Sequence, residues 1–349
     1  MKLRSMESVD FSQQTVLVRV DFNIEQTNIA NVEEHFRLSI VKDTIDALAQ
    51  APGVKIALLT HFGRPDGQVV EEYSVKNLTE AIARALKREV VFVSDCVGEV
   101  VTSALAQLSG DQILLLENVR FHEGEEKNDA DFATILAAPF TICVNEAFSV
   151  CHRAHASVEA ITRVLPTYAG LRLIKELEEL DEVREHPEHP AIAIIGGAKI
   201  ETKLPLIQAL EKSFDAILVG GKVANEALDK KLAFSEKVLL PQDFESGARL
   251  DIGPQTIGYY TKIIGTAKTV IWNGPMGKFE EKPYDIGTDA ILNALLGSSA
   301  YIVIGGGESL AVLENAGVIG KISFVSSGGG AMLEYLSGAQ LPGLLALAE

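Results

Sequence analysis

The chain has 349 residues, 47% of them hydrophobic, and a formal net charge of −17 at pH 7. This length favours two domains over one, and so acidic a protein is a poor candidate for binding nucleic acid or a membrane surface, because both are polyanions. An anionic small molecule can still bind where arginine, lysine and histidine gather locally.

The cysteines and the N-terminus indicate a soluble, cytoplasmic protein. Cys96, Cys143 and Cys151 are odd in number and lack CxxC spacing, which argues against a disulfide framework or a structural zinc site. Residues 1–10 contain no apolar signal segment, and no run approaches the roughly 18 apolar residues of a membrane-spanning helix.

Ten short apolar runs are predicted strands. In chain order they lie at residues 16–18, 56–59, 90–93, 113–116, 142–144, 191–195, 217–219, 269–272, 302–304 and 322–325. They are continuous rather than alternating, which is typical of parallel strands buried on both faces. Amphipathic segments at helical spacing lie between them, for example Ile45 with Leu48, and Leu173 with Leu177. The pattern predicts an α/β protein with two doubly wound, Rossmann-like parallel sheets.

A domain boundary is expected near the middle of the chain. Residues 166–190 open with Pro166, continue through an acidic helical stretch at 175–180 and end in the proline-rich segment 186–190. We interpret them as an interdomain helix followed by a linker between a first domain at 1–165 and a second that begins at 191.

Polar and cationic side chains follow the strands of the first half. In parallel sheets, ligands bind beyond the carboxyl ends of the strands. These ends carry Asp21 and Asn23; His61 and Arg64; Arg120 and His122; and Glu146 followed by His152, Arg153 and His155. Cations at one sheet edge repel one another, so a polyanionic ligand is their natural complement. The alternative is that each arginine pairs with a nearby carboxylate.

Glycines follow the strands of the second half. They occur in the segments GGAK at 196–199, GGK at 220–222, NGPMG at 273–277, GGGES at 305–309 and GGG at 328–330. Glycine lets backbone N–H groups surround a phosphate, and a following helix N-terminus adds a favourable dipole. Neither the Walker A pattern nor GxGxxG occurs, so the commonest nucleotide fingerprints are excluded while nucleotide binding stays open.

Together, the residues that follow the strands of the two halves indicate phosphoryl transfer. Neither a Ser-His-Asp order nor an HExxH cluster stands out, and His152 and His155 lack a third ligand signature. Positioning and electrostatics without a covalent nucleophile are what phosphoryl transfer between a nucleotide and a small anionic metabolite needs.

Eight segments in this order form a highly specific combination. They are VRVDFN at 18–23, HFGRP at 61–65, LENVRFH at 116–122, HRAH at 152–155, GGAK at 196–199, DIGP at 251–254, WNGPMG at 272–277 and SGGGA at 327–331. Through them the chain resembles the phosphoglycerate kinases over nearly its whole length. The resemblance implies a hinge-closing, bilobal kinase, monomeric, which makes ATP from ADP and 1,3-bisphosphoglycerate in glycolysis by direct in-line transfer after domain closure.

The resemblance also implies where the ligands bind. The N-terminal domain, 1–165, would bind 3-phosphoglycerate or 1,3-bisphosphoglycerate, and residues 336–349 would return to it. The substrate-binding residues would be Asp21, Phe22, Asn23, Arg37, His61, Phe62, Gly63, Arg64, Arg120 and Arg153. Arg37, placed by its spacing to Thr44, would reach the transferred group.

The C-terminal domain, 191–335, would bind Mg²⁺ with ATP or ADP. The nucleotide-binding residues would be Gly197, Lys203, Gly221, Asn273, Glu280, Gly306, Gly307, Glu308 and Ser309. Arg37, Lys199 and Lys203 would be the catalytic cations, with Lys199 stabilising the phosphoryl group in flight, and Glu308 would be the contact to magnesium.

The chain departs from the family pattern mainly on the nucleotide side. Glu308 and Glu146 stand where the family usually has aspartate, Lys222 replaces a glycine, and Lys278 replaces a small or apolar residue. The stretch between residues 228 and 251 is also short for the family. We expect Lys278 to be solvated. A non-catalytic nucleotide- or metabolite-binding homologue with a regulatory role stays open as the alternative.

Overall fold

The computed structural model describes residues 1–24 and 36–349. They form two compact units: Met1–Lys175 together with Gln340–Glu349, and Glu176–Ala339. Helix α7 (Leu171–Glu185) begins in the first unit and ends in the second. In the described part of the chain, no helix is long and apolar enough to cross a membrane.

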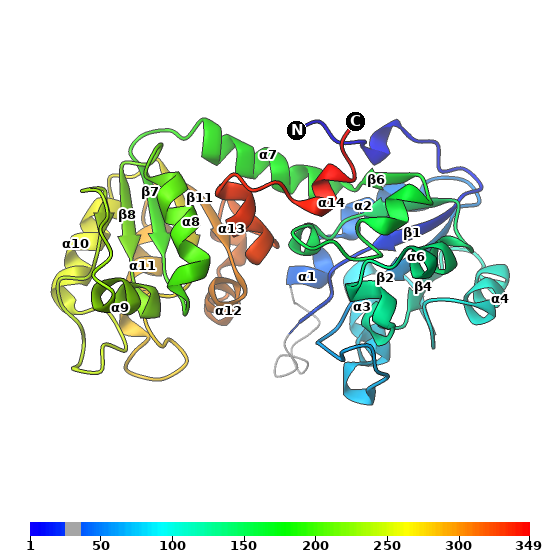
Figure 1. Cartoon of the computed structure of the whole chain (residues 1–349), viewed down its shortest axis with the longest axis horizontal. Helices are drawn as coiled ribbons and strands as arrows, with labels where there is room; N and C mark the ends of the chain where they lie inside the picture. Colours follow the sequence, from blue (N-terminus) through cyan, green and yellow to red (C-terminus); the bar gives the residue numbers. More distant parts are fainter. Residues whose placement is uncertain (25–35) are drawn as a thin grey trace. The chain divides into compact units, whose positions relative to one another are not determined.

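The first unit is built on a six-stranded parallel sheet in the order β3-β4-β2-β1-β5-β6 (Figure 1). Its strands are β1 (Thr15–Arg19), β2 (Lys55–Leu59), β3 (Val90–Val93), β4 (Ile113–Leu116), β5 (Ile142–Asn145) and β6 (Thr167–Ala169). Its helices are α1 (Phe36–Ser39), α2 (Lys42–Ala49), α3 (Thr79–Leu86), α4 (Glu99–Gln107), α5 (Glu123–Glu126), α6 (Ala130–Ala137) and α14 (Pro342–Leu345). Short 3-10 helices lie at Met6–Ser8, Glu71–Tyr73, Val75–Leu78, Val119–Phe121, Phe148–Val150 and Ala160–Arg163.

Helices cover both faces of this sheet because its strands are apolar on both sides. Val16 packs in a core with Ile45 of α2 and Ile82 of α3. Its neighbour Leu17 points to the opposite face and packs in a second core with Val101 of α4 and Leu136 of α6. Alternate side chains of one strand thus enter two separate cores, as a doubly wound sheet requires.

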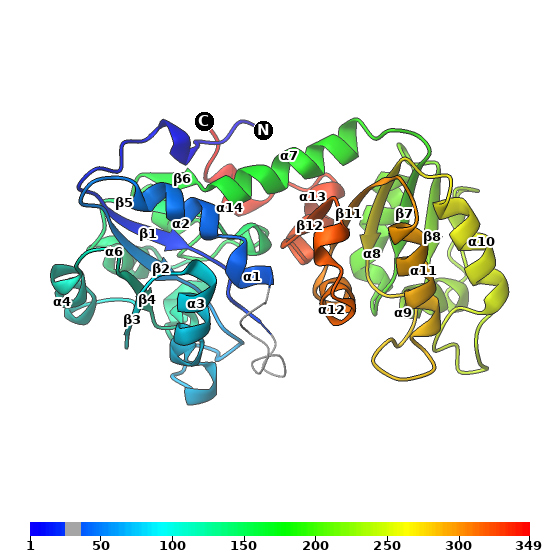
Figure 2. The ribbon, with the colours of Figure 1, turned by 180° about the vertical axis from the view of Figure 1, so that it is seen from behind.

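The second unit repeats the architecture with the strand order β12-β11-β10-β7-β8-β9 (Figure 2). Its strands are β7 (Ala191–Ile195), β8 (Ala216–Val219), β9 (Val238–Leu239), β10 (Thr269–Asn273), β11 (Tyr301–Gly305) and β12 (Phe324–Ser326). Its helices are α8 (Ile200–Leu210), α9 (Gly221–Asp229), α10 (Pro254–Ile264), α11 (Ile286–Leu296), α12 (Gly307–Ala316) and α13 (Gly330–Leu336), with a 3-10 helix at Ile319–Lys321. α10 packs beside α11, and α13 beside α8.

All ten predicted strands are confirmed, with ends that differ by at most two residues. The apolar pattern does not predict β6 and β9, which are the last strands at one edge of each sheet. In the stretch expected to hold only a helix and a linker, residues 167–169 form β6 instead, paired with β5 through Cys143 and Thr167. β6 consists of Thr, Tyr and Ala, and β9 has only two residues, so neither gives a hydrophobic run as long as those of the predicted strands.

The two chain ends meet within the first unit. Leu3 forms an antiparallel bridge with Ala348, and the N–H of Arg4 donates to the carbonyl of Leu347 at 3.0 Å. The N–H of Gly343 donates to the carbonyl of Cys151 at 2.9 Å, and a Cβ at this glycine would lie 2.9 Å from the Cα of Cys151. A glycine here therefore lets α14 seat against the first unit.

Helix α7 begins against a buried carboxylate. Glu146, 2% exposed, accepts the N–H groups of Arg172 and Leu173, both at 3.0 Å, and the hydroxyl of Thr44. The first N–H groups of a helix have no partner within it, so this carboxylate supplies one. Burial raises the pKa of Glu146 to about 7, against the lowering effect of these hydrogen bonds.

Glu146→Gln should change the pH dependence of stability. The carboxyl's ordinary pKa is 4.5, so between there and about 7 the folded chain holds a proton that the unfolded chain has lost. The free energy of unfolding of the wild type should therefore fall as pH rises through this window, by up to ~3 kcal/mol relative to Glu146→Gln. Urea denaturation from about pH 5 to about pH 8 measures it. Glu80→Gln, at a side chain 90% exposed, is the control, and a difference that does not vary with pH contradicts the expectation.

Candidate functional site

In the first unit, a buried ion pair stands just beyond the carboxyl end of β1. Asp21, 8% exposed, accepts hydrogen bonds from Arg37 and from the hydroxyl of Ser149, and from the N–H of Asn23 at 3.0 Å. Burial would raise the pKa of Asp21, but Arg37, His61 and these hydrogen bonds outweigh it and hold the pKa well below its ordinary value. Asp21 is therefore ionised and fixes the guanidinium of Arg37.

The loops after β1, β2 and β4 are joined by hydrogen bonds from backbone N–H groups to asparagine side chains. The N–H of Gly63 donates to Oδ1 of Asn23 at 2.9 Å, and the N–H of Phe62 donates to Oδ1 of Asn118 at 3.1 Å. The side chains of Phe22 and Phe62 are 0% and 1% exposed and lie in the core. These two predicted site residues therefore shape the loops, while their rings are turned into the core.

Arg120 and Arg153 bring positive charge to the same edge of the sheet. Arg120, 3% exposed, donates from Nη1 to the carbonyl of Gly63 at 2.8 Å, and its Nε lies 3.2 Å from Glu126. Burial lowers the pKa of Arg120 to about 10; Glu126 opposes this, whereas the nearby charge of Arg153 reinforces it. The guanidinium groups are thus close enough to repel one another.

His152 and His155 are not additional cations at neutral pH. Burial, followed by the neighbouring arginines, lowers the pKa of His155 to about 3. Burial and then Arg153 lower the pKa of His152, which accepts the Nε–H of Arg153 at 3.1 Å. The positive charge resides in the arginines.

The carboxylate-pairing alternative holds for two of the arginines. Arg37 pairs with Asp21, and Arg120 approaches Glu126, as the carboxylate-pairing alternative expects. Arg64, whose side chain is exposed, and Arg153 form no ion pair with any residue that the structure describes. We call Asp21, Arg37, His61, Arg120 and Arg153 the arginine cluster.

In the second unit, the turns after β7, β8, β10 and β11 are hydrogen-bonded to one another. The N–H of Gly197 donates to the carbonyl of Pro275 at 3.0 Å, and that of Gly221 to the carbonyl of Met276 at 2.8 Å. Gly274 has φ +90°, and a Cβ there would lie 2.5 Å from the backbone of Gly196, so only glycine allows this approach.

A lysine and an asparagine lie inside this group of turns. Lys203, 9% exposed, donates to Oδ1 of Asn273, whose Nδ2 donates to the carbonyl of Gly305 at 2.6 Å. Burial lowers the pKa of Lys203 to about 8, against the attraction of Glu308. A Cβ at Gly197 would meet Oε2 of Glu308 at 2.9 Å. We call Gly197, Lys203, Asn273, Glu308 and Ser309 the glycine-turn cluster.

Helices begin directly at these turns. α12 starts at Gly307, next to Glu308, and the hydroxyl of Ser309 accepts the N–H of Gly274 at 2.7 Å. Lys199 is the exposed N-cap of α8. The unpaired N–H groups and dipole of a helix N-terminus favour an anion.

The remaining sequence candidates lie at the surface. Glu280 is exposed on the loop between β10 and α11. Lys222 is exposed in the first turn of α9. Lys278 is 49% exposed and pairs with Glu281, in agreement with a solvated lysine.

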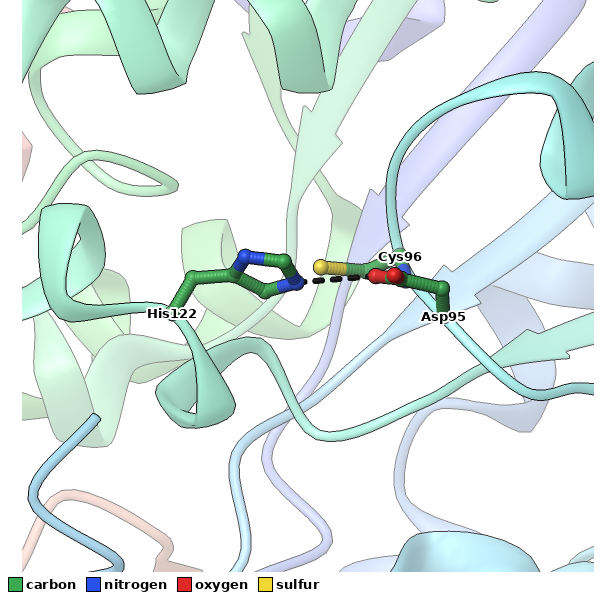
Figure 3. Close-up of side chains that lie close together, drawn as sticks. All are labelled: Asp95, Cys96 and His122. Atoms are coloured by element: carbon green, nitrogen blue, oxygen red, sulfur yellow. Dashed lines mark hydrogen bonds and ion pairs between the residues drawn. The ribbon is translucent and has the colours of Figure 1, made fainter. Parts of the chain in front are cut away.

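The sequence patterns do not predict one group of metal-ligand types, Asp95, Cys96 and His122 (Figure 3). Their ligand atoms lie within 4.8 Å of one another. Oδ1 of Asp95 is hydrogen-bonded to Nε2 of His122 at 2.8 Å and accepts the N–H of Cys96 at 2.6 Å. These hydrogen bonds account for the arrangement without an ion.

Sequence reasoning also overlooks a buried polar chain formed by Arg19, Ser157 and Glu125. Arg19 is 1% exposed and Glu125 is 0% exposed. The available signal was a charged residue between two valines, Val18 and Val20, directly after a predicted strand, where burial of an unpaired arginine is not tolerated.

Two parallel α/β units, one with arginines and one with glycine turns at the carboxyl ends of its strands, define a class of two-unit phosphotransferases. A family model described as phosphoglycerate kinase matches residues 6–243 and 235–339. The chain belongs to the phosphoglycerate kinase family, as the resemblance predicted, and is therefore a kinase.

Individual relatives agree in sequence and in fold. The chain is 40% identical over 396 aligned residues to phosphoglycerate kinase of Rhodospirillum centenum, covering 99% of this chain and 100% of that protein. It is 38% identical over 390 residues to the enzyme of Moorella thermoacetica, covering 99% of each. The crystal structure of phosphoglycerate kinase from Pyrococcus horikoshii OT3 matches with a TM-score of 0.86 at 28% identity, covering 99% of this chain and 98% of that one. The enzyme of Coxiella burnetii matches with a TM-score of 0.78 at 28% identity, covering 99% of each.

The comparisons also bear on the shortened stretch. The family match is divided at residues 235–243, inside the region that the sequence marks as short. β9 lies here, and the buried hydroxyl of Tyr260 donates to the carbonyls of Leu239 at 2.6 Å and Val219 at 3.0 Å. Tyr260 thus ties the short strand to β8.

Proposed function

We propose that this chain catalyses reversible transfer of a phosphoryl group between 1,3-bisphosphoglycerate and Mg-ADP, the glycolytic reaction that gives 3-phosphoglycerate and ATP. A carboxyl group is the acceptor in the reverse direction. The observation that carries the proposal is that each unit holds one half of such a site: the arginine cluster in the first, and the glycine-turn cluster in the second.

The arginine cluster suits a small polyanion. Arg37, Arg120 and Arg153, with the exposed Arg64, would bind its phosphate and carboxylate oxygens through charge-assisted hydrogen bonds. Asp21 orients Arg37, and because an ionised carboxylate only accepts hydrogen bonds, it would contact a hydroxyl group of the ligand rather than its anionic oxygens. Asn23 holds the loop that carries Gly63.

The glycine-turn cluster suits nucleotide phosphates. Backbone N–H groups at Gly306 and Gly307 would surround them, and Lys203 would add a positive charge. The N–H groups of Gly197 and Gly221 already donate to Pro275 and Met276, so these two glycines would instead let the phosphates come close to the backbone. The exposed carboxylate of Glu308 is an oxygen ligand of the kind that Mg²⁺ prefers, so it would hold the ion with the nucleotide. Magnesium supplies charge neutralisation on the phosphate oxygens.

The reaction needs no nucleophile from the protein. A terminal β-phosphate oxygen of ADP attacks the phosphorus of the acyl phosphate, the P–O bond to the carboxyl group breaks, and 3-phosphoglycerate leaves as a carboxylate. Arg37 and Lys199 would compensate the charge on the three equatorial oxygens. Direct transfer demands that donor and acceptor meet away from water, so we expect the units to approach one another when both ligands bind.

A coupled assay with 3-phosphoglycerate and Mg-ATP tests the proposal. The presence of Arg37, Lys199 and Lys203 together favours the enzyme over a non-catalytic homologue, because a binding module does not need every transfer-site cation. Turnover at rates of at least about 1 per second is expected for a kinase. Folded protein that binds nucleotide without turnover would favour the regulatory homologue instead.

Nucleotide affinity should depend on the protonation of Lys203. Because its pKa is lowered to about 8, the amine is charged below that pH and neutral above it. We expect KM for Mg-ADP to rise by roughly tenfold as pH passes through about 8, since a charge-assisted contact is lost. In Lys203→Arg, which stays charged, the inflection should disappear. An unchanged inflection in this variant would assign the titration to another group.

A further inference from the structure

Arg19, the last residue of β1, carries a charge that is almost entirely buried. A buried guanidinium is tolerated when it is paired and hydrogen-bonded. Its Nε donates to Oγ of Ser157 at 2.8 Å, and its Nη1 donates to the carbonyl of Val20. Oγ of Ser157 donates in turn to Oε1 of Glu125 at 2.7 Å. The negative charge of Glu125, linked to Arg19 through Ser157, therefore balances the positive charge of Arg19 inside the unit.

The remaining amino group of Arg19 lies against the ring of His61. Nη2 of Arg19 is 3.3 Å from Nδ1 of His61, a residue that is 4% exposed. Arginine has N–H donors and no acceptor, so Nδ1 must provide the lone pair. An imidazole that accepts at Nδ1 carries its proton on Nε2 and is neutral.

The surroundings of the ring agree with this state. Asp21, with Oδ1 3.9 Å from Nδ1 of His61, is the neighbour that would favour a protonated ring, but it already accepts hydrogen bonds from Arg37 and Ser149. Burial holds the pKa of His61 well below its usual value, and the nearby guanidinium groups reinforce this against the pull of Asp21. Among the described residues, Nε2 has no hydrogen-bond partner.

We propose that Arg19 is a positioning residue that holds His61 in the neutral tautomer protonated on Nε2. In this tautomer the ring offers one N–H donor to 3-phosphoglycerate. Phosphate and ionised carboxylate groups present only acceptor oxygens. The opposite tautomer would present a lone pair to them and repel them. This ligand role rests on the proposed function, whereas the tautomer does not.

NMR of the intact chain with ¹⁵N-labelled histidine measures the tautomer. The chain has seven histidines, and the His61 signals are those that vanish in His61→Gln. We expect a protonated Nε2 and an unprotonated Nδ1 throughout the neutral pH range. A protonated Nδ1, or a ring that titrates near neutral pH, overturns the inference. Because this readout needs no turnover, it stands or falls separately from the kinase assay.

Arg19→Lys tests the positioning role. Lysine keeps the buried charge but loses the planar fork. We expect His61 to populate both tautomers and KM for 3-phosphoglycerate to rise roughly tenfold or more, with KM for Mg-ATP within about twofold of the wild type. The control is Arg163→Lys, at a surface ion pair of the same unit where the arginine is 64% exposed. Wild-type tautomer and KM in folded Arg19→Lys refute the role of Arg19.

A pair of His61 variants tests the donor without altering Arg19. The amide N–H of glutamine can replace the donor at Nε2, whereas leucine of similar size has none. His61→Gln should therefore bind 3-phosphoglycerate roughly tenfold more tightly than His61→Leu, measured by calorimetry. Equal affinity of the two variants would show that the ligand does not use the Nε2 proton.

Discussion

Lys199→Ala should lower kcat by roughly 10²–10³-fold and leave KM for both substrates within a few-fold of the wild type. Lys199 is exposed at the N-cap of α8, beside the turn that holds Gly197. There its ammonium group can add to the positive end of the helix dipole. Charge on the equatorial oxygens peaks only during transfer, so a cation aimed at them acts mainly on the transition state.

Steady-state kinetics in both directions, with single-turnover measurements, separate an effect of Lys199 on the transfer step from an effect on substrate binding. Lys222→Ala is a matched control, because Lys222 is an exposed lysine at the first turn of the neighbouring α9, and it should change kcat by less than about threefold. If Lys199→Ala raises KM while kcat is unchanged, Lys199 contributes uniform binding and the transfer role is wrong.

Arg37→Ala should also lower kcat by roughly 10²–10³-fold, since it removes the other cation expected at the transferred group. A second effect follows from the structure. Asp21 would lose its strongest favourable charge, and burial would then raise its pKa toward or above the ordinary value. In the wild type the lowered pKa of Asp21 adds stability above the ordinary pKa of 3.8, so the variant should be less stable than the wild type at neutral pH, and this difference should shrink as pH falls below 3.8.

Arg37→Lys and the double variant Asp21→Asn/Arg37→Ala separate these effects. Lysine keeps the charge but not the planar fork, so stability should largely recover while activity stays low. In the double variant the pH-dependent loss of stability should vanish, as measured by urea denaturation at several pH values. A kcat for Arg37→Ala within about tenfold of the wild type would exclude Arg37 from transfer.

The strands were predictable because both faces of each sheet are covered. Val16 and Leu17 enter opposite cores, so both must be apolar, and the resulting runs are visible without any structure. β6 and β9 were not predicted, because Thr167–Ala169 contains no Val, Ile or Leu and Val238–Leu239 has only two residues. Pairing with a neighbour defines them more than hydrophobicity does.

Residue type and position after a strand were enough to name candidate site residues, but not to predict what surrounds them. Arg37, Arg120 and Lys203 were named from motif and spacing, but their surroundings were not. The nearby carboxylates at Asp21 and Glu126 and the lowered pKa of Lys203 depend on burial and on charges distant in sequence. Arg19 shows the limit most clearly, because its partners Ser157 and Glu125 lie more than 100 positions away along the chain.

Residue pattern alone thus specified the α/β class, ten of the twelve strands of the two sheets and the kind of chemistry at each set of strand ends, because hydrophobic periodicity and glycine turns are local properties of a chain. Tertiary structure decided which groups carry charge. Folding leaves His61 and His155 neutral, raises the pKa of Glu146 to about 7 and lowers that of Lys203 to about 8. Such shifts arise from desolvation and from neighbours that only the fold brings together.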